Sequence, residues 1–201
     1  LKLKQNLLIL LFITALTKIS LRHNNITGTG GNIMNTLESA KINDLEICMK
    51  ILNDGKMFQR EQGFIQWDAD YPTVNLIKGD IENQKGYVVK SDGKIAGYMC
   101  IDFDGEPAYK DIRDGSWNTD DSYAVVHRMA LNKDFIGKGM SDITFKLIEK
   151  LCLEKDIHNI RVDTHSSNKR MQHVFKRNGF KQCGVIIYQG GDRLAFDKKL
   201  D

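Results

Sequence analysis

VVHRMALNKDFIGKGMS, residues 125–141, is the stretch that decides the fold of this chain. An apolar run comes first, a short polar turn follows, and Gly137 and Gly139 precede residues with the apolar spacing of a helix. This order predicts a strand, a turn and then an amphipathic helix. The first backbone N–H groups of such a helix have no intrahelical acceptor, so they form a ready site for an anion.

A second stretch, NKRMQHVFKRNGF at residues 168–180, predicts another helix. Asn168 is suited to cap its start, and Gly179 is suited to end it in a left-handed conformation. Phe180 is expected in the core. Taken together, the two stretches predict an enzyme that binds an acyl carrier bearing a diphosphate.

The remaining pattern predicts a mixed α/β single domain over residues 34–201. Gly55 is expected to end an early helix, Pro72 to sit in the first turn of a later one, and residues 91–93 to form a hairpin turn. The predicted strands cover residues 36–40, 86–90, 94–103, 123–131, 160–164, 183–188 and 194–196. The predicted helices cover residues 44–53, 56–62, 72–83, 140–155 and 168–178, with a long acidic loop at 104–122.

Composition excludes several classes of protein. The chain has 201 residues, of which 41% are apolar and 27% are charged, as in ordinary globular proteins. A net charge of +3, without a basic run, does not favour a nucleic-acid partner. The four cysteines (Cys48, Cys100, Cys152 and Cys183) lie far apart in apolar runs. Buried free thiols are therefore expected rather than a zinc or redox site, and a cytoplasmic location without a metal fits best.

Residues 1–33 differ from the rest of the chain and allow three interpretations. Lys2 and Lys4 precede an apolar run over residues 7–16, which resembles a signal peptide but is shorter than the roughly 20 residues that span a bilayer. The favoured alternative is that translation begins at Met34. A genuine cytosolic extension is the third, and no membrane partner is expected.

The two stretches resemble the GCN5-related N-acetyltransferase (GNAT) superfamily, and the similarity extends from about Thr36 to the C-terminus. The family's coenzyme loop follows an Arg/Gln-x-x-Gly-x-Gly/Ala pattern. Gly139 matches it, whereas Ile136 and Ser141 depart from it. The resemblance implies a mostly antiparallel central sheet with a splayed strand pair, flanked by helices. It also implies acetyl-CoA as co-substrate.

The resemblance further assigns coenzyme contacts by position. Backbone N–H groups of the loop would hold the pyrophosphate, while the end of the preceding strand would pair with the pantetheine arm like an added strand. Asn168 would bond the pantetheine, cap the helix, or do both. The coenzyme contacts implied in this way are Met129, Ala130, Leu131, Ile136, Gly137, Lys138, Gly139, Met140, Ser141, Asn168 and Phe175.

The catalytic groups are less clear in the sequence. His127 lies on the strand before the loop and is a candidate general base, because histidine exchanges protons near neutral pH; a buried structural histidine is the alternative. Phe175 occupies the position where many family members carry a tyrosine acid. Tyr188 is the substitute candidate for that acid, with simple packing as its alternative.

The acceptor is expected to be a primary amine on a small molecule, peptide or protein. Trp67 and Tyr71 lie in a loop that would border the acceptor, so they form a binding wall or pack together. The acidic loop 104–122 would favour cationic amines or be merely solvated. A non-catalytic acyl-CoA-binding module is the alternative function, and a homodimer is possible in either case.

Overall fold

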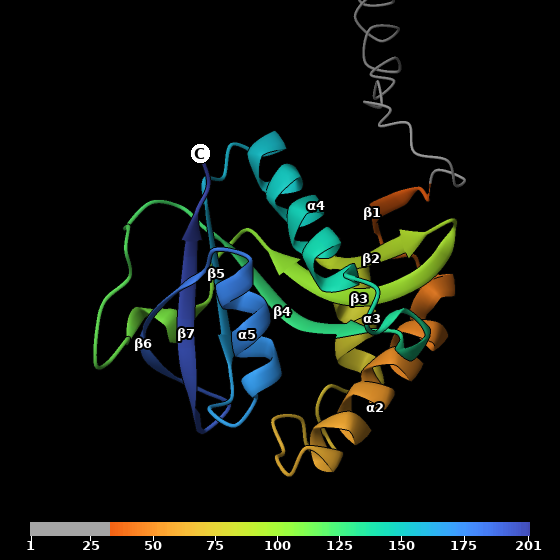
Figure 1. The fold of residues 1–201 in the computed structure, drawn as a ribbon, viewed down its shortest axis with the longest axis horizontal. Coiled ribbons are helices and arrows are strands. Elements are labelled where there is room, and N and C mark those ends of the chain that lie inside the picture. Colours follow the sequence, from red (N-terminus) through yellow and green to blue (C-terminus); the bar gives the residue numbers. More distant parts are fainter. Residues whose placement is uncertain (1–32) are drawn as a thin grey trace, which may run out of the picture. The chain divides into compact units, whose positions relative to one another are not determined.

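The structure, a computed structural model, describes residues 33–201 (Figure 1). The three interpretations of the leader concern residues outside this range. The strands are β1 (Asn35–Ser39), β2 (Gly86–Ser91), β3 (Lys94–Asp102), β4 (Ala124–Leu131), β5 (Asn159–Thr164), β6 (Lys181–Tyr188) and β7 (Gly191–Lys199). The helices are α2 (Leu45–Glu61), α3 (Val74–Glu82), α4 (Met140–Glu154) and α5 (Lys169–Arg177), with the 3-10 turns η1 (Ile42–Asp44), η2 (Pro107–Lys110) and η3 (Lys133–Phe135).

The strands form one sheet in the order β1-β2-β3-β4-β5-β7-β6. Neighbours run antiparallel except β4 and β5, which are parallel and pair at two positions only, Ala124 with Ile160 and Val125 with Arg161. Beyond Val125 these two strands separate (Figure 1). The mostly antiparallel mixed sheet with a splayed pair confirms the predicted fold class.

Helices cover both faces of the sheet (Figure 1). On one face α4 and α5 bury a core that includes Met99, Val126 and Phe196. On the other face α2 and α3 pack on β2, β3 and β4 around Leu52 and Tyr98. Each fully buried aliphatic or aromatic side chain of this kind contributes about 1.5–3 kcal/mol to the hydrophobic driving force.

The break expected at Gly55 is wrong, because α2 continues through it to Glu61. A Cβ atom at this position would lie 3.2 Å from Cζ3 of Trp67, so the glycine leaves room for the indole ring against the helix. The two helices predicted at 44–53 and 56–62 are thus one. The glycine is therefore explained by packing against Trp67 and not by the end of a helix.

The start of α3 also differs from the prediction. Thr73 caps the helix, its hydroxyl accepting from the N–H of Leu76 at 3.1 Å, and Pro72 precedes the cap instead of lying in the first turn. The last strand is longer than predicted, because β7 pairs along its length with both β5 and β6.

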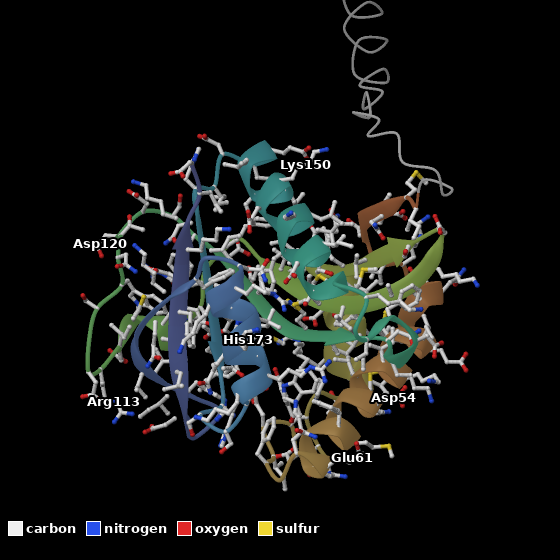
Figure 2. All side chains as sticks on the ribbon, viewed as in Figure 1. Asp54, Glu61, Arg113, Asp120, Lys150 and His173 are labelled. Carbon is white, nitrogen blue, oxygen red and sulfur yellow. The ribbon has the colours of Figure 1, made fainter. Side chains whose placement is uncertain are left out.

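The connection between β3 and β4 is not a simple solvated loop. It contains η2, and the side chain of Tyr109 within η2 is buried beside Val125, Ile186 and Ala195. Trp117 donates from Nε1 to the Tyr109 carbonyl at 2.8 Å. Arg113 and Asp120 do lie exposed on the outer side of this connection (Figure 2).

The four cysteines are free and buried, as predicted. Burial raises the pKa of each thiol to about 12, so all four stay protonated at neutral pH. Within residues 33–201, no helix combines the length and apolar character needed to cross a membrane.

Candidate active site

The glycine loop delivers unpaired backbone donors to the start of α4. Gly137 and Gly139 adopt φ values of +80° and +69°, which favour glycine, and Gly139 is the N-cap residue of α4. Within the described residues, the backbone N–H groups of Gly137, Gly139, Met140 and Ser141 donate to no acceptor. These four groups, at the positive end of the α4 dipole, suit an anionic ligand.

The splay leaves one edge of β4 open beside this loop. Residues 126–131 bond β3 on one side, but β5 has already separated from them on the other. Their outward N–H and C=O groups can therefore accept an extended ligand as an added strand. Met129, Ala130 and Leu131 occupy this edge.

A β-bulge interrupts β4 immediately before that edge. Tyr98 pairs with Ala130 while Cys100 pairs with His127, so β4 has one residue more than β3 between these pairs. Arg128 occupies the bulge with a φ of +53°, which is unusual for a residue with a side chain. The bulge therefore places His127 and Ala130 on the same face of the sheet.

A buried ion pair holds the bulge. Arg128 donates from Nε and Nη2 to the two carboxylate oxygens of Asp80 on α3, at 3.0 and 2.8 Å. Asp80 also accepts from the Tyr98 hydroxyl at 2.8 Å, and Nη1 of Arg128 donates to the Tyr71 hydroxyl at 3.2 Å. Arg128 and Asp80 have side chains that are each 8% exposed. This network links α3, β3, β4 and the loop before α3.

His127 lies between two carboxylates. Its Nε2 is 3.3 Å from Oε2 of Glu106, and its Nδ1 is 3.9 Å from Oδ1 of Asp163. Contact with the imidazole lowers the pKa of Glu106, whereas burial raises the pKa of Asp163. Glu106 therefore serves as a charged acceptor beside the ring.

Tyr188 stacks on His127 from the end of β6. The ring centroids are 5.2 Å apart and the planes are inclined by 13°. Burial raises the pKa of Tyr188 well above its ordinary value of about 10, so the hydroxyl stays protonated. Such a hydroxyl can donate a hydrogen bond, and its raised pKa makes it a weaker acid than a free tyrosine.

One cavity of about 530 Å³ brings the predicted site residues together. It extends from the glycine loop, along β4, to His127 and Tyr188. It also meets His173, which is labelled on α5 in Figure 2. Of the predicted site residues, Lys138 alone does not line it. The ammonium of Lys138 instead lies 5.5 Å from the ring centroid of Phe135.

Asn168 caps α5, its Oδ1 accepting from the N–H of Met171 at 3.1 Å. Its amide Nδ2 reaches Oε1 of Gln66 at 3.4 Å. The same Gln66 oxygen accepts from the hydroxyl of Thr164 and the N–H of His165, both at 3.1 Å. Gln66, which the sequence did not mark, thus joins the loop before α3 to the end of β5.

The aromatic residues pack in the core. Trp67 is 8% exposed and packs between α2 and α3, in line with the packing alternative, and both Trp67 and Tyr71 also line the cavity. Phe175 is buried against Phe145, Phe180 and Phe196, so this position offers no hydroxyl. Phe180 is in the core as predicted.

Other residues of the site carry no local sequence signal. Arg128 and Asp80 are 48 positions apart, and Tyr109 reaches Asp163 across 54 positions with a hydroxyl-to-carboxylate distance of 2.8 Å. Arg193 on β7 also lines the cavity. Among residues 33–201, no cluster of three or more His, Cys, Asp or Glu side chains is arranged to hold a metal ion.

Comparisons with known proteins point to one group of enzymes. The sequence profile of the Acetyltransferase (GNAT) family matches residues 50–180. A GNAT-family acetyltransferase of Streptococcus agalactiae 2603 has a solved structure similar to this one, with a TM-score of 0.76 and 29% identity over 83% of this chain and 96% of that chain.

Two further relatives are more distant. A candidate alanine N-acetyltransferase of ribosomal protein bS18 from Bacillus subtilis (strain 168) is 24% identical over 98 residues, which are 49% of this chain and 54% of that protein. The match thus spans about half the length of this curated relative. The aminoglycoside acetyltransferase AAC(6')-Ib, solved with coenzyme A and kanamycin, is 20% identical over 83% of this chain and 95% of that chain, with a TM-score of 0.61. This last likeness concerns the fold.

Proposed function

The chain belongs to the GNAT acetyltransferase family, and on that premise we propose that it transfers an acetyl group from acetyl-CoA to a primary amine. Membership confirms the resemblance inferred from the sequence. The observation that carries the proposal is the row of unpaired N–H groups at Gly137, Gly139, Met140 and Ser141, next to the open edge of β4.

The coenzyme fits this arrangement through backbone groups. Its pyrophosphate would accept from the loop N–H groups, and its pantetheine arm, which contains amides, would pair with residues 129–131. Ile136 in place of the family's Arg or Gln removes a side-chain contact worth roughly 1.5–3 kcal/mol where it is made, but leaves the backbone donors intact. Asn168 retains one amide N–H for the pantetheine, because capping uses its oxygen and Gln66 accepts from Nδ2 only once.

His127 is the proposed general base. The amine must lose a proton as its nitrogen attacks the thioester carbon, and the cavity gives His127 access to that nitrogen. Glu106, beside Nε2, orients the ring and favours the tautomer that leaves Nδ1 without a proton. The carboxylates on both sides then stabilise the imidazolium.

Tyr188 is the proposed acid. Collapse of the tetrahedral intermediate breaks the carbon–sulfur bond and releases a thiolate, which needs one proton. Tyr188 remains protonated and lines the cavity, whereas Phe175 cannot donate. Tyr188 would give its hydroxyl proton to the thiolate and then take a proton from solvent. The proton that His127 took from the amine would be released to solvent.

The location proposed for this activity is the cytoplasm. Acetyl-CoA dependence and four free thiols, each kept reduced, are consistent with a reducing compartment.

Two measurements on the full chain test the proposal. Acetyl-CoA at about 100 times its dissociation constant should stabilise the fold by about 2.7 kcal/mol, visible as a raised thermal midpoint. Free thiol release with a panel of amines should then report turnover. A raised midpoint without thiol release would favour the non-catalytic acyl-CoA-binding module, to which the missing hydroxyl at Phe175 points. An unchanged midpoint would overturn the coenzyme site.

A further inference from the structure

Arg193 has a buried, positively charged side chain that makes few hydrogen bonds to the rest of the protein. Its side chain is 9% exposed and lines the cavity. A guanidinium has five N–H donors, yet within the described residues Arg193 makes one hydrogen bond, from Nη1 to the Asp192 carbonyl at 3.2 Å. Burying a cation is costly unless an anion and hydrogen bonds compensate it. The remaining N–H donors are therefore available to an anion in the cavity.

The neighbouring carboxylate does not satisfy this need. Asp163 lies with Oδ2 at 4.0 Å from Nε of Arg193, beyond hydrogen-bond distance. Its Oδ1 accepts from Tyr109 at 2.8 Å and faces His127 at 3.9 Å. Burial also raises the pKa of Asp163. The other nearby carboxylate, Asp192, is directed to the surface, where it pairs with Arg113 at 2.6 Å.

The turn between β6 and β7 is shaped around this guanidinium. A Cβ atom at Gly191 would lie 2.9 Å from Nη1 of Arg193, so the glycine makes room for the side chain to fold back over the backbone. The pKa of His165 is lowered by burial and then by the charge of Arg193. Among residues 33–201, no carboxylate is paired with that charge by a hydrogen bond.

Arg193 and the proposed base flank the same residue. Asp163 faces His127 with one oxygen and Arg193 with the other, so an amine at His127 and an anion at Arg193 would be neighbours. The cavity of about 530 Å³ must also admit the thioester end of the coenzyme, which leaves room for a small acceptor. A planar guanidinium matches a carboxylate with two parallel hydrogen bonds.

We propose that the acceptor is a small amino acid, with its amine at His127 and its carboxylate on Arg193. This inference rests on the proposed function. The amine nitrogen attacks the thioester and loses its proton, whereas the carboxylate stays bound and unchanged. Acceptors that lack a free carboxylate within a few atoms of the amine, such as aminoglycosides or protein N-termini, would bring no anion to Arg193.

The test compares acceptors that differ in one group. Glycine, β-alanine and 4-aminobutanoate would each be assayed against the corresponding carboxamide, with rates expressed per concentration of neutral amine. We expect kcat/KM to favour the best acid over its amide by about 10- to 100-fold, the range of a charge-assisted hydrogen bond. Equal rates for every acid and amide pair would overturn the inference, and this comparison needs no variant.

Arg193→Gln then assigns the preference to its residue. We expect it to lose most of the acid-over-amide preference while the midpoint shift with acetyl-CoA is unchanged. Arg113→Gln is the matched control, because it removes an exposed guanidinium that pairs with Asp192, the residue before Arg193, and it should keep the preference. A preference that survives Arg193→Gln would overturn the assignment.

Two further acceptors, kanamycin and a peptide with an N-terminal alanine, distinguish a failure of the amino-acid inference from a failure of the acetyltransferase proposal. Acetylation of either one, with no transfer to any amino acid, would overturn the amino-acid inference and leave the acetyltransferase proposal standing. Transfer to no amine at all would overturn both.

Discussion

The two ends of the cavity are formed by different kinds of chemical group. The coenzyme end consists of backbone groups, namely the N–H groups of the glycine loop and the open edge of β4. The acceptor end consists of buried side chains that reach it from separate elements, such as Glu106, His127 and Asp163. A backbone site tolerates changes of side chain, whereas a side-chain network depends on each member. This difference implies that substitutions at the acceptor end should have the larger effects.

Replacing the proposed base should produce the largest effect. We expect His127→Ala to lower kcat by about 100- to 10,000-fold, the usual contribution of a general base, with little change in acetyl-CoA affinity. Steady-state kinetics and a coenzyme titration would measure the two quantities. His158→Ala is the control, because that imidazole is exposed. An unchanged kcat would remove His127 from the mechanism.

Breaking the ion pair that holds the bulge should come next. Asp80→Asn leaves a buried guanidinium without its carboxylate, so we expect the free energy of unfolding to fall by about 3–5 kcal/mol. Urea denaturation would measure it. Asp54→Asn, which removes an exposed pair with Lys50, should cost less than about 1 kcal/mol. Equal losses in the two variants would contradict the structural role of the buried pair.

The backbone-built end should respond more mildly. Gly139→Ala forces a residue with a Cβ into a left-handed conformation, and we expect about 1–2 kcal/mol of destabilisation together with weaker acetyl-CoA binding. Gly93→Ala is a matched control, because Gly93 has a φ of +77° in the β2–β3 turn and, as at Gly139, an added Cβ meets nothing within 4 Å. Identical coenzyme affinities in the two variants would argue against the loop as the anion site.

A pH series should give the smallest effect. The pKa of Glu106 is lowered in the folded state, so its contribution to stability is present above its ordinary pKa of about 4.5 and is lost as the pH falls through the lowered value. Near pH 6 we expect the free energy of unfolding of the wild type to be about 1 kcal/mol higher than that of Glu106→Gln. This difference should shrink toward pH 4 and below. Thermal unfolding across this range measures the gap; a gap that widens on acidification would contradict the assignment.

The coenzyme end could be predicted from the sequence because its signals are local. Glycines at fixed spacing, an apolar run before them and helical spacing after them are all visible in residues 125–141. The acceptor end could not, since Asp80 and Arg128, or Tyr109 and Asp163, meet only after the sheet forms. Gly55 was misread for the same reason: the ring that requires it belongs to Trp67, in the following loop.

The bulge at Arg128 also changes the phase of β4. In a regular strand, His127 and Ala130 would face opposite sides, because three residues separate them. The extra residue places both side chains on one face of the sheet, with His127 paired to Cys100 and Ala130 paired to Tyr98 on β3. Counting back from the glycine loop in steps of two therefore assigns the wrong side to every position before Arg128. In a relative without the extra residue, the strand position next to the histidine would face the acceptor in place of the histidine itself. This change would occur even if the rest of the two sequences aligned without a gap.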